Sequence, residues 1–281
     1  MDREQFAKAL ADKDERTRRY GDLVALHYDR AADYFHSGWG DSFHFTWYQG
    51  DEPRQVAQAR QQHRLADLGR FSAGAAVADI GCGAGGPDAA VARHSGARVT
   101  GVDLSPRHIA LAQRLHAGLP TLRFQVGDAM QLPFPCAAFD GAFSIEALCH
   151  TPDKAKAHGA VARILRPGAS WVGYDWFTTH TADTAAYRDR VEPLCRQFVL
   201  PNLLALDDLP RTLEHSGFRT EGVGSYADLG DLTRNWTEYE PPRTGRDRTP
   251  LDRQLHESLS LLRAAVEHGD FVFGWWQAVR H

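Results

Sequence analysis

The sequence predicts an α/β protein with a mostly parallel sheet and helices on both faces. Three observations support this class. Short apolar runs alternate with helical stretches from residue 75 onward, a glycine-rich turn at 81–86 joins the first run to a helix, and residues 271–281 (FVFGWWQAVRH) end the chain as a strongly apolar strand. Repeated strand–helix alternation gives right-handed βαβ units and hence a parallel sheet.

Composition narrows the function classes. The 281 residues carry a net charge of −4 with acids and bases interspersed, and 43% are hydrophobic. This balance supports a sizeable core and argues against nucleic-acid binding. No stretch approaches the roughly 20 apolar residues of a membrane span, and no secretory signal is evident, so we expect a cytoplasmic protein. We expect reduced thiols and no metal site, because no CxxC pair or zinc-type spacing joins the cysteines, which are Cys82, Cys136, Cys149 and Cys195.

Residues 1–70 are expected to cap the core. Residues 1–35 show an amphipathic helical pattern, which fits either a covering helix or a lid over a pocket. The segment 33–48, DYFHSGWGDSFHFTWY, is rich in aromatic and histidine side chains and follows neither helical nor strand periodicity. Its aromatic rings either fill a core or line a pocket. Residues 51–70 return to a helix, with Gly69 as its C-cap.

Residues 71–177 are expected to form the core of the fold, and residues 178–281 to complete it with helical insertions. Ser105 suits the N-cap and Pro106 the first turn of the helix that follows the second strand. Residues 178–206 have helical composition without a strand, and 228–268 are polar and mostly helical. The predicted strands are 75–80, 97–104, 122–129, 139–148, 169–177, 218–227 and 271–281, and the predicted helices between them are 87–94, 107–118, 153–165 and 207–217.

The glycine-rich turn is a candidate ligand loop. Gly81, Gly83 and Gly86 fit the G-x-G-x-x-G pattern of dinucleotide-binding loops. Glycine tolerates positive φ and lets a ligand approach the main chain, and the helix start offers free N–H groups. By itself the pattern is weak, and the choice of ligand depends on the residues around it.

Three acidic residues direct that choice. Asp79 lies in the strand just before the loop, a position at which an NAD site requires no acid. Asp103 ends the second strand, about 20 residues on, and is placed to hold a ribose diol. Asp128 ends the third strand, where it can accept a hydrogen bond from an adenine amino group. The bland alternative for Asp79 is that it caps backbone.

Together, D-x-G-x-G-x-G and the two downstream acids resemble class I S-adenosylmethionine-dependent methyltransferases. The resemblance implies a Rossmann-like seven-stranded sheet of order 3-2-1-4-5-7-6 with an antiparallel last strand, an N-terminal helical lid and helical insertions. It also implies S-adenosylmethionine as the cofactor and S-adenosylhomocysteine as its product. The cofactor-binding residues implied are Asp79, Gly81, Gly83, Asp103, Leu104, Asp128, Ala129 and Ser42.

Further stretches are similar to the sterol C-24 methyltransferases. These are GWGDSFHF at 38–45, GCGAGGP at 81–87, IEALCHTP at 145–152 and YDW at 174–176. The sequence at 241–254, PPRTGRDRTPLDRQ, departs from that family. The resemblance implies a C-methyltransferase of secondary metabolism that acts on an isoprenoid alkene: a prenyl chain of a natural product, a prenyl diphosphate or a sterol-like side chain.

Alkene methylation has definite requirements. Aligning the π-bond with the S–CH₃ axis can be worth roughly 7–11 kcal/mol. The resulting carbocation needs aromatic faces, each worth about 0.5–2 kcal/mol, and a base. Glu146, at the end of the fourth strand, is the first choice and His150 the second, as base or by orienting Glu146. Burial would raise the pKa of Glu146 and a sulfonium would oppose the rise. The candidate cation-stabilising residues are Tyr34, Trp39, Phe43, Phe45, Trp176 and Phe177.

Alternatives stay open at this point. Glu146 could bind the sulfonium or a backbone amide, His150 could cap a helix or fill the pocket, and Trp176 and Phe177 could be core. The protein could instead be an O- or N-methyltransferase of a small metabolite, like tocopherol-type enzymes, or a dehydrogenase-like or non-catalytic nucleotide binder. A diphosphate substrate would call for a basic cluster, with Mg²⁺. Candidates are Arg188, Arg190, Arg196 and the basic run 243–248. The N-terminal segment could also serve a homo-oligomer contact.

Overall fold

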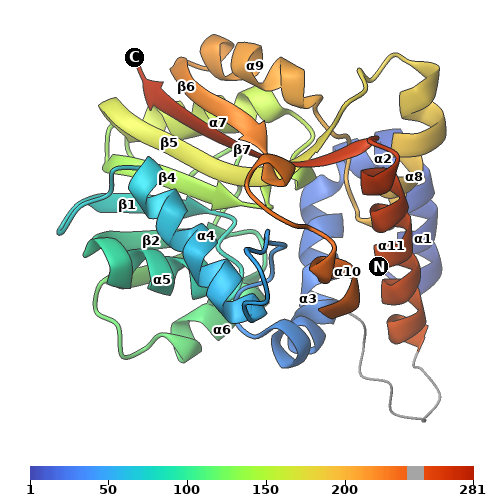
Figure 1. Cartoon of the computed structure of the whole chain (residues 1–281), viewed down its shortest axis with the longest axis horizontal. Helices are drawn as coiled ribbons and strands as arrows, with labels where there is room; N and C mark the ends of the chain where they lie inside the picture. The colour runs from blue at the N-terminus through green and yellow to red at the C-terminus, as the bar shows by residue number, and fades with distance from the viewer. Residues whose placement is uncertain (239–249) are drawn as a thin grey trace.

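A computed structural model describes residues 1–238 and 250–281, apart from the side chains of residue 3, residues 30–39, residue 238 and residues 250–255. Its centre is a seven-stranded sheet of order β3-β2-β1-β4-β5-β7-β6, in which β7 runs antiparallel to both neighbours (Figure 1). The predicted fold class and strand order are therefore confirmed. The strands are β1 Ala76–Ile80, β2 Arg98–Asp103, β3 Leu122–Val126, β4 Phe139–Ile145, β5 Leu165–Thr178, β6 Phe218–Ser225 and β7 Phe271–Arg280.

Helices cover both faces of this sheet, which explains the unbroken apolar runs of its central strands. On one face lie α4 (Arg54–Leu68), α5 (Gly86–Ser95) and α6 (Pro106–Leu115). On the other lie α7 (Lys154–Ile164) and α9 (Leu209–His215). Each face of the sheet has its own hydrophobic core. Val77 and Phe143 pack in the core under α4 and α5, whereas Ala78 and Ala142 pack in the core under α7 and α9.

Local sequence signals set the helix ends. The Ser105 hydroxyl accepts a hydrogen bond from the His108 N–H at 3.0 Å, and Pro106 occupies the first turn of α6. The Asp153 carboxylate caps α7 by accepting from the Lys156 N–H at 2.9 Å. Gly69 is the C-cap of α4, as predicted.

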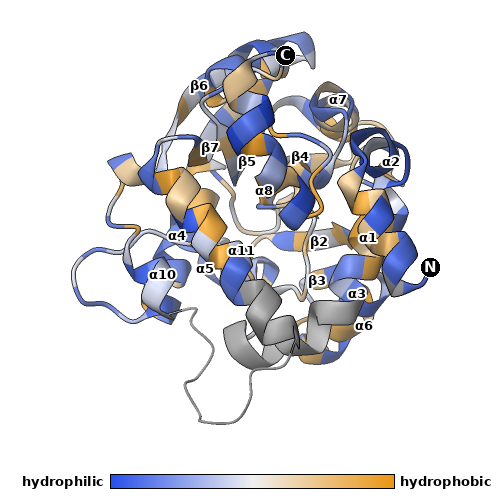
Figure 2. Cartoon of the chain, turned by 90° about the vertical axis from the view of Figure 1, so that its right-hand side faces the viewer, coloured by the Kyte–Doolittle hydropathy of each residue, from blue (hydrophilic) through white to orange (hydrophobic). Residues whose placement is uncertain are grey.

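A group of helices lies beyond the carboxyl ends of the parallel strands, at the right of Figure 1. Among them, α1 and α3 share a small apolar cluster that includes Ala9, Leu23 and Val24. Hydrophilic and hydrophobic residues alternate along α1 and α4 (Figure 2), as expected for helices that cover a core. No described helix is long and apolar enough to cross a membrane. The group consists of α1 Arg3–Ala11, α2 Lys13–Arg18, α3 Tyr20–Trp39, α8 Glu192–Gln197, α10 Arg234–Glu238 and α11 Pro250–Glu267.

Two segments differ from the sequence-based prediction. The prediction that residues 33–48 are not helical was wrong for the first part of this segment. There α3 continues to Trp39, and the chain turns at Gly40, where φ is +78°. A run of mixed aromatic and polar residues hides the end of that helix, which only the glycine marks. β5 starts at Leu165 rather than 169, because Leu165 pairs with Phe139 before an irregularity in the ladder.

Candidate active site

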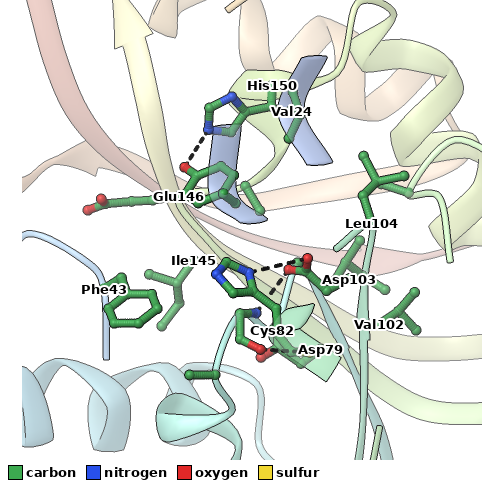
Figure 3. Close-up of a pocket in the computed structure, with 18 of the residues that line it drawn as sticks. Val24, Phe43, Asp79, Cys82, Val102, Asp103, Leu104, Ile145, Glu146 and His150 are labelled. Carbon is green, nitrogen blue, oxygen red and sulfur yellow. Dashed lines mark hydrogen bonds and ion pairs between the residues drawn. The ribbon is translucent and has the colours of Figure 1, made fainter. Parts of the chain in front are cut away.

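A cavity lies at the carboxyl ends of β1, β2 and β4, beneath α3. Ligands of open α/β sheets bind at this edge. Figure 3 shows two groups of residues around it. We call the ends of β1, β2 and β3 with the loop 81–86 the cofactor half. We call α3, residues 41–45, Glu146 and His150 the acceptor half.

The glycines of the loop have different tasks. Gly81 (φ +88°) and Gly83 (φ +52°) both line the cavity. A Cβ on Gly81 would lie 2.1 Å from the Cβ of Ala147, whereas one on Gly83 would meet only Phe43, at 3.8 Å. Gly83 therefore leaves its main chain open to a ligand. Gly86 instead allows the segment at Asp41 to approach closely, and its N–H donates to the Asp41 carbonyl at 3.1 Å.

Asp103 is held in place from both sides. Its Oδ2 accepts from the Gly83 N–H at 3.0 Å and its Oδ1 from the Ser105 N–H at 2.8 Å. The His108 Nδ1 lies 3.5 Å from Oδ1. Although burial alone would raise the pKa of Asp103, the His108 ring and these backbone groups lower it below its ordinary value. An oriented, ionised carboxylate at the cavity wall fits the ribose diol expected there.

The other cofactor-half candidates divide into those at the wall and those behind it. Leu104 and Ala129 line the cavity. Asp128 is not among its lining residues; its Oδ1 accepts from the Met130 N–H at 2.7 Å and from the Tyr20 hydroxyl. Ser42 also lies behind the wall, where its hydroxyl accepts from Gln62 at 3.1 Å. Asp128, after β3, and Ser42, in the segment 41–45, thus lie outside the cavity wall in this structure.

Asp79 lines the cavity next to the loop and is 1% exposed. Its pKa is raised well above the ordinary value by burial and then by the neighbouring Asp88 of α5. Among the described residues, no backbone N–H donates to the Asp79 carboxyl, and its Oδ1 has no hydrogen-bond partner. The capping alternative therefore gains no support from these contacts.

Glu146 ends β4 with an unusual backbone. Its φ is +50°, a conformation that costs a non-glycine residue on the order of 1–3 kcal/mol and gathers at functional sites. Its Oε1 accepts from the Phe45 N–H at 3.0 Å. Burial raises the pKa of Glu146 well above its ordinary value, against the lowering effects of the Trp176 indole and the Phe45 N–H. Figure 3 shows it between His150 and Phe43.

His150 forms a pair with Tyr28 of α3. Its Nε2 lies 2.9 Å from the Tyr28 hydroxyl, and its Nδ1 lies 3.4 Å from the Val199 carbonyl oxygen. Because a carbonyl only accepts, Nδ1 carries the proton and Nε2 accepts from Tyr28. Burial lowers the pKa of His150 to about 3, so the ring is neutral at neutral pH. Both ring nitrogens are thus engaged, which favours an orienting role over proton abstraction.

The structure separates the six aromatic candidates. Phe43 lines the cavity. Phe45 and Trp176 pack in an aromatic core behind Glu146, with ring centroids 5.9 Å apart. Side chains alternate along a strand, so Phe177 points to the opposite face of β5 and packs 6.4 Å from the Trp276 ring. Phe177 is thereby removed from the reacting centre. The side chains of Tyr34 and Trp39 lie outside the described residues.

Several residues at this site escaped the sequence analysis. Tyr20, Val24 and Tyr28 line the cavity from one face of α3, and His108 lines it from α6. The spacing of four residues between Tyr20, Val24 and Tyr28 places them on one face of α3, because residues i and i+4 share a face of a helix. This spacing is a sequence signal that could have identified them. The amphipathic pattern of residues 1–35 predicts a covering helix or a lid, but it does not single out these side chains as pocket residues. Asp88 was missed because an acid in the first turn of a helix is common.

The basic candidates for a diphosphate site are engaged elsewhere. Arg190 lies 3.3 Å from the Asp270 carboxylate and Arg196 lies 3.8 Å from Glu192, and each is about half exposed. Arg188 donates to the Asp183 carbonyl at 3.0 Å. The run 243–248 lies outside the described residues. Within the described ranges, no three His, Cys, Asp or Glu side chains gather as metal ligands.

Comparison with known proteins identifies the family. Residues 78–172 match the family model described as a methyltransferase domain. The chain is 36% identical over 202 residues to 24-methylenesterol C-methyltransferase 2 of Oryza sativa subsp. japonica, covering 70% of this chain and 55% of the relative. It is 35% identical over 230 residues to sterol 24-C-methyltransferase erg-4 of Neurospora crassa, covering 80% of this chain and 61% of the relative. The matched regions thus span less than two thirds of these relatives.

Solved structures share the fold. Geranyl diphosphate C-methyltransferase from Streptomyces coelicolor A3(2) has a TM-score of 0.73 at 17% identity and matches 93% of this chain and 98% of its own. The [4+2]-cyclase SpnF has a TM-score of 0.76 at 20% identity and matches 92% of this chain and 96% of its own. At these identities the likeness concerns the fold alone. With the domain match, the sterol methyltransferase relatives and the confirmed strand order, the chain belongs to the class I S-adenosylmethionine-dependent methyltransferases.

Proposed function

We propose that this protein binds S-adenosylmethionine in the cofactor half and transfers its methyl group to an alkene carbon of an isoprenoid in the acceptor half. The observation that carries the proposal is Glu146. It is a partly buried carboxyl with a strained backbone, in a wall of aromatic and apolar side chains that adjoins the glycine loop. The sterol C-methyltransferase relatives support the same chemistry.

The residues of the cofactor half fit this cofactor. Gly83 offers open main chain, Asp103 offers two oriented oxygens for a diol, and Asp79 places a carboxyl beside the loop. When bound, the cofactor supplies an electrophilic methyl group on a positively charged sulfur. Carboxyl groups near that charge stabilise it, because opposite charges attract strongly where water is excluded.

The acceptor half provides a surface suited to an apolar alkene. Val24, Phe43 and Ile145 contribute apolar area to the cavity wall, and Tyr28 adds an aromatic ring. Such walls exclude water and tolerate positive charge at a ring face. Excluding water matters because a carbocation formed on the acceptor would otherwise react with it.

We assign the removal of the final proton to Glu146. Its Oε1 is fixed by the Phe45 N–H, which leaves the carboxylate further lone pairs for a proton. His150 is held between Tyr28 and Val199, and we assign it to positioning the Tyr28 ring over the cavity. The Glu146 pKa is raised by burial, and a nearby sulfonium charge would lower it so that the carboxylate form is present.

We propose that residues 1–70 act as the cap of this site. Three hydrogen bonds tie α3 to different strand ends: Tyr20 to Asp128, Tyr28 to His150, and the Ser105 hydroxyl to Asp29 at 2.5 Å. Because all three lie around the cavity, opening of α3 would expose both halves together. Closure would then follow cofactor binding.

We favour an uncharged acceptor near the reacting centre. The charged groups at the cavity wall are carboxyls, including Asp79, Asp103 and Glu146. They attract a sulfonium and repel a diphosphate. A prenylated natural product or a sterol-like side chain meets this requirement, and a prenyl diphosphate would have to keep its charged end away from this wall.

Incubation with methyl-labelled S-adenosylmethionine tests the proposal. The acceptor panel contains a Δ24 sterol, prenyl diphosphates and prenylated indoles, with phenols and amines as rivals. We expect label in a carbon-bound methyl group of at least one isoprenoid. General-base removal contributes about 10²–10⁴-fold, so Glu146→Gln should lower turnover at least about 100-fold. Glu221→Gln, the same change in a surface ion pair, should not. Methylated phenol or amine in place of any C-methylated product would refute the proposal.

A further inference from the structure

The first turn of α5 holds a carboxyl that the proposed methyl transfer does not use. Asp88 is 0% exposed, and neither of its oxygens has a hydrogen-bond partner among the described residues. A buried ionised carboxylate without donors is costly, so the structure must satisfy this group in another way.

Asp79 is the group that it faces. The Asp88 Oδ1 lies against Gly101, the residue that pairs with Asp79 in the β1–β2 ladder, and the Asp79 Oδ1 is likewise buried without a hydrogen-bond partner among the described residues. Two carboxylates are acceptors only, whereas a carboxylic acid beside a carboxylate supplies one donor. One proton shared between Asp79 and Asp88 therefore satisfies oxygens that would otherwise be unpaired.

The fold makes room for this pair. A Cβ on Gly101 of β2 would lie 2.8 Å from the Asp88 Oδ1 and 2.7 Å from the Cys82 Cβ. Asp79 pairs with Gly101 in the β1–β2 ladder. The absence of a side chain at this one position thus lets the Asp88 carboxyl lie against β2, behind the cavity wall that Asp79 lines.

We propose that Asp88 is a specificity-determining residue of the cofactor half: it shares one proton with Asp79 in the free protein, and the positive charge of S-adenosylmethionine displaces that proton on binding. The proton passes to the solvent, and the pair goes from one negative charge to two. The inference rests on the proposed function, since it assumes that this cofactor binds beside Asp79.

The surrounding charges agree with this assignment. The titratable groups that face the pair are Cys82 from the loop and Asp103 from β2, and Asp103 in turn faces His108 of α6. Cys82 and Asp103 are both acids, so neither offers the pair a positive charge. Burial, followed by Asp88, raises the pKa of Asp79, and burial is the main cause that raises the pKa of Asp88 to about 7.

The consequence is a pH-dependent preference for substrate over product. S-adenosylmethionine carries a sulfonium that S-adenosylhomocysteine lacks, so only the former brings a fixed positive charge to the pair. Its affinity should rise with pH through the range in which the free pair loses its last proton. A linked proton changes affinity by at most tenfold per pH unit. The affinity of the product should change less.

Isothermal titration calorimetry tests this directly. Each cofactor form is titrated into the protein from pH 6 to pH 9, in two buffers of different ionisation enthalpy, which gives the number of protons released. For the wild type we expect net release with S-adenosylmethionine and less with S-adenosylhomocysteine. Asp88→Asn, whose amide can donate to Asp79, should abolish the difference. The matched change Asp153→Asn, at the exposed N-cap of α7, should leave it intact.

The outcomes separate the two claims. Binding of S-adenosylmethionine to the wild type without proton release overturns the inference and leaves the proposed function standing. Equal proton release by wild type and Asp88→Asn overturns it as well, since the proton then comes from elsewhere, such as the cofactor amine. No binding of S-adenosylmethionine overturns the proposed function and this inference together. Where the variant fails to fold, the difference in proton release between the two cofactor forms on the wild type still decides. Both forms carry the same amine, and only S-adenosylmethionine carries the sulfonium, so equal release by the two forms overturns the inference.

Discussion

The two halves of the cavity are built in different ways. The cofactor half comes from consecutive strand ends, and one of its carboxylates, Asp103, is held by the N–H groups of Gly83 and Ser105. The acceptor half is assembled from distant segments, since Glu146 is held by Phe45 and His150 by Tyr28. The glycine loop can be recognised from a sequence motif. The composition of the acceptor wall cannot, because it depends on how α3 packs against the rest of the protein. The difference predicts that changes in the two halves separate cofactor binding from acceptor turnover.

Gly81 is the position that joins the halves, and its change should have the largest effect. In Gly81→Ala the new Cβ would lie 2.1 Å from Ala147, which follows Glu146, and the residue would keep φ near +88°. A clash and a strained backbone together cost on the order of 3 kcal/mol. We expect loss of both cofactor binding and turnover and a thermal midpoint lower by about 6–12 °C.

Gly83→Ala is the matched control for stability, because its Cβ would meet only Phe43, at 3.8 Å. Calorimetric melting of both variants measures the effect. Equal midpoints for the two variants would show that the contact with Ala147 does not join the halves.

Asp103→Ala should act on the cofactor half alone. It removes a carboxylate that accepts from two backbone N–H groups and that we assign to the ribose. Hydrogen bonds to charged groups are worth about 1.5–3 kcal/mol each. Two such bonds to the ribose diol total about 3–6 kcal/mol, so the S-adenosylmethionine Kd should weaken roughly 100- to 10,000-fold. Asp140→Ala, at the other end of the sheet beside the Ala76 N–H, is the control for the titration. An unchanged Kd would remove Asp103 from the cofactor half.

The pH profile of turnover should report on the acceptor half. Glu146 acts as a base in its ionised form, and burial raises its pKa. At saturating cofactor, the rate should therefore rise with pH, about tenfold per unit below that pKa, and then level off. The residual rate of Glu146→Gln should lack this rising limb. A rate that falls as pH rises over the same range would contradict the assignment.

Tyr28→Phe should have a moderate effect, confined to the acceptor half. It removes the hydroxyl that His150 Nε2 accepts from, at 2.9 Å, and keeps the ring. A neutral hydrogen bond is worth about 1 kcal/mol, so turnover should fall roughly 5- to 10-fold with the cofactor Kd unchanged. Tyr174→Phe, whose hydroxyl accepts from Arg64 away from the cavity, is the comparison variant. Weaker cofactor binding in Tyr28→Phe would contradict the assignment of Tyr28 to the acceptor half alone.

Tyr20→Phe should give the smallest effect, on the cap. The Tyr20 hydroxyl donates to the Asp128 carboxylate and ties α3 to the end of β3. Its loss should speed the release of S-adenosylhomocysteine a few-fold in stopped-flow measurements, because this hydrogen bond helps to hold the cap closed. Tyr226→Phe, whose hydroxyl accepts from Gln61 in the core, should leave the release rate unchanged. Unchanged release in Tyr20→Phe would mean that α3 does not open during turnover.

The contrast between the halves also explains what could be predicted from sequence. The approximate strand positions, the glycine loop and Asp103 followed from local patterns, because strand ends and turns are specified by neighbouring residues. The strand order followed instead from the resemblance to class I methyltransferases. The positions of Phe45, Trp176 and Phe177 did not, since aromatic composition is the same for a core and for a pocket wall. Tyr28 and Asp88 were missed because their partners, His150 and Asp79, are brought to them only by tertiary packing.

The most direct test of the account is the atom that receives the methyl group. Product made with ¹³C-methyl S-adenosylmethionine and an isoprenoid acceptor can be followed by ¹³C NMR and mass spectrometry. We predict a methyl signal on a former alkene carbon and the loss of one hydrogen from the acceptor. A labelled methyl group on oxygen or nitrogen, with the alkene intact, would contradict it.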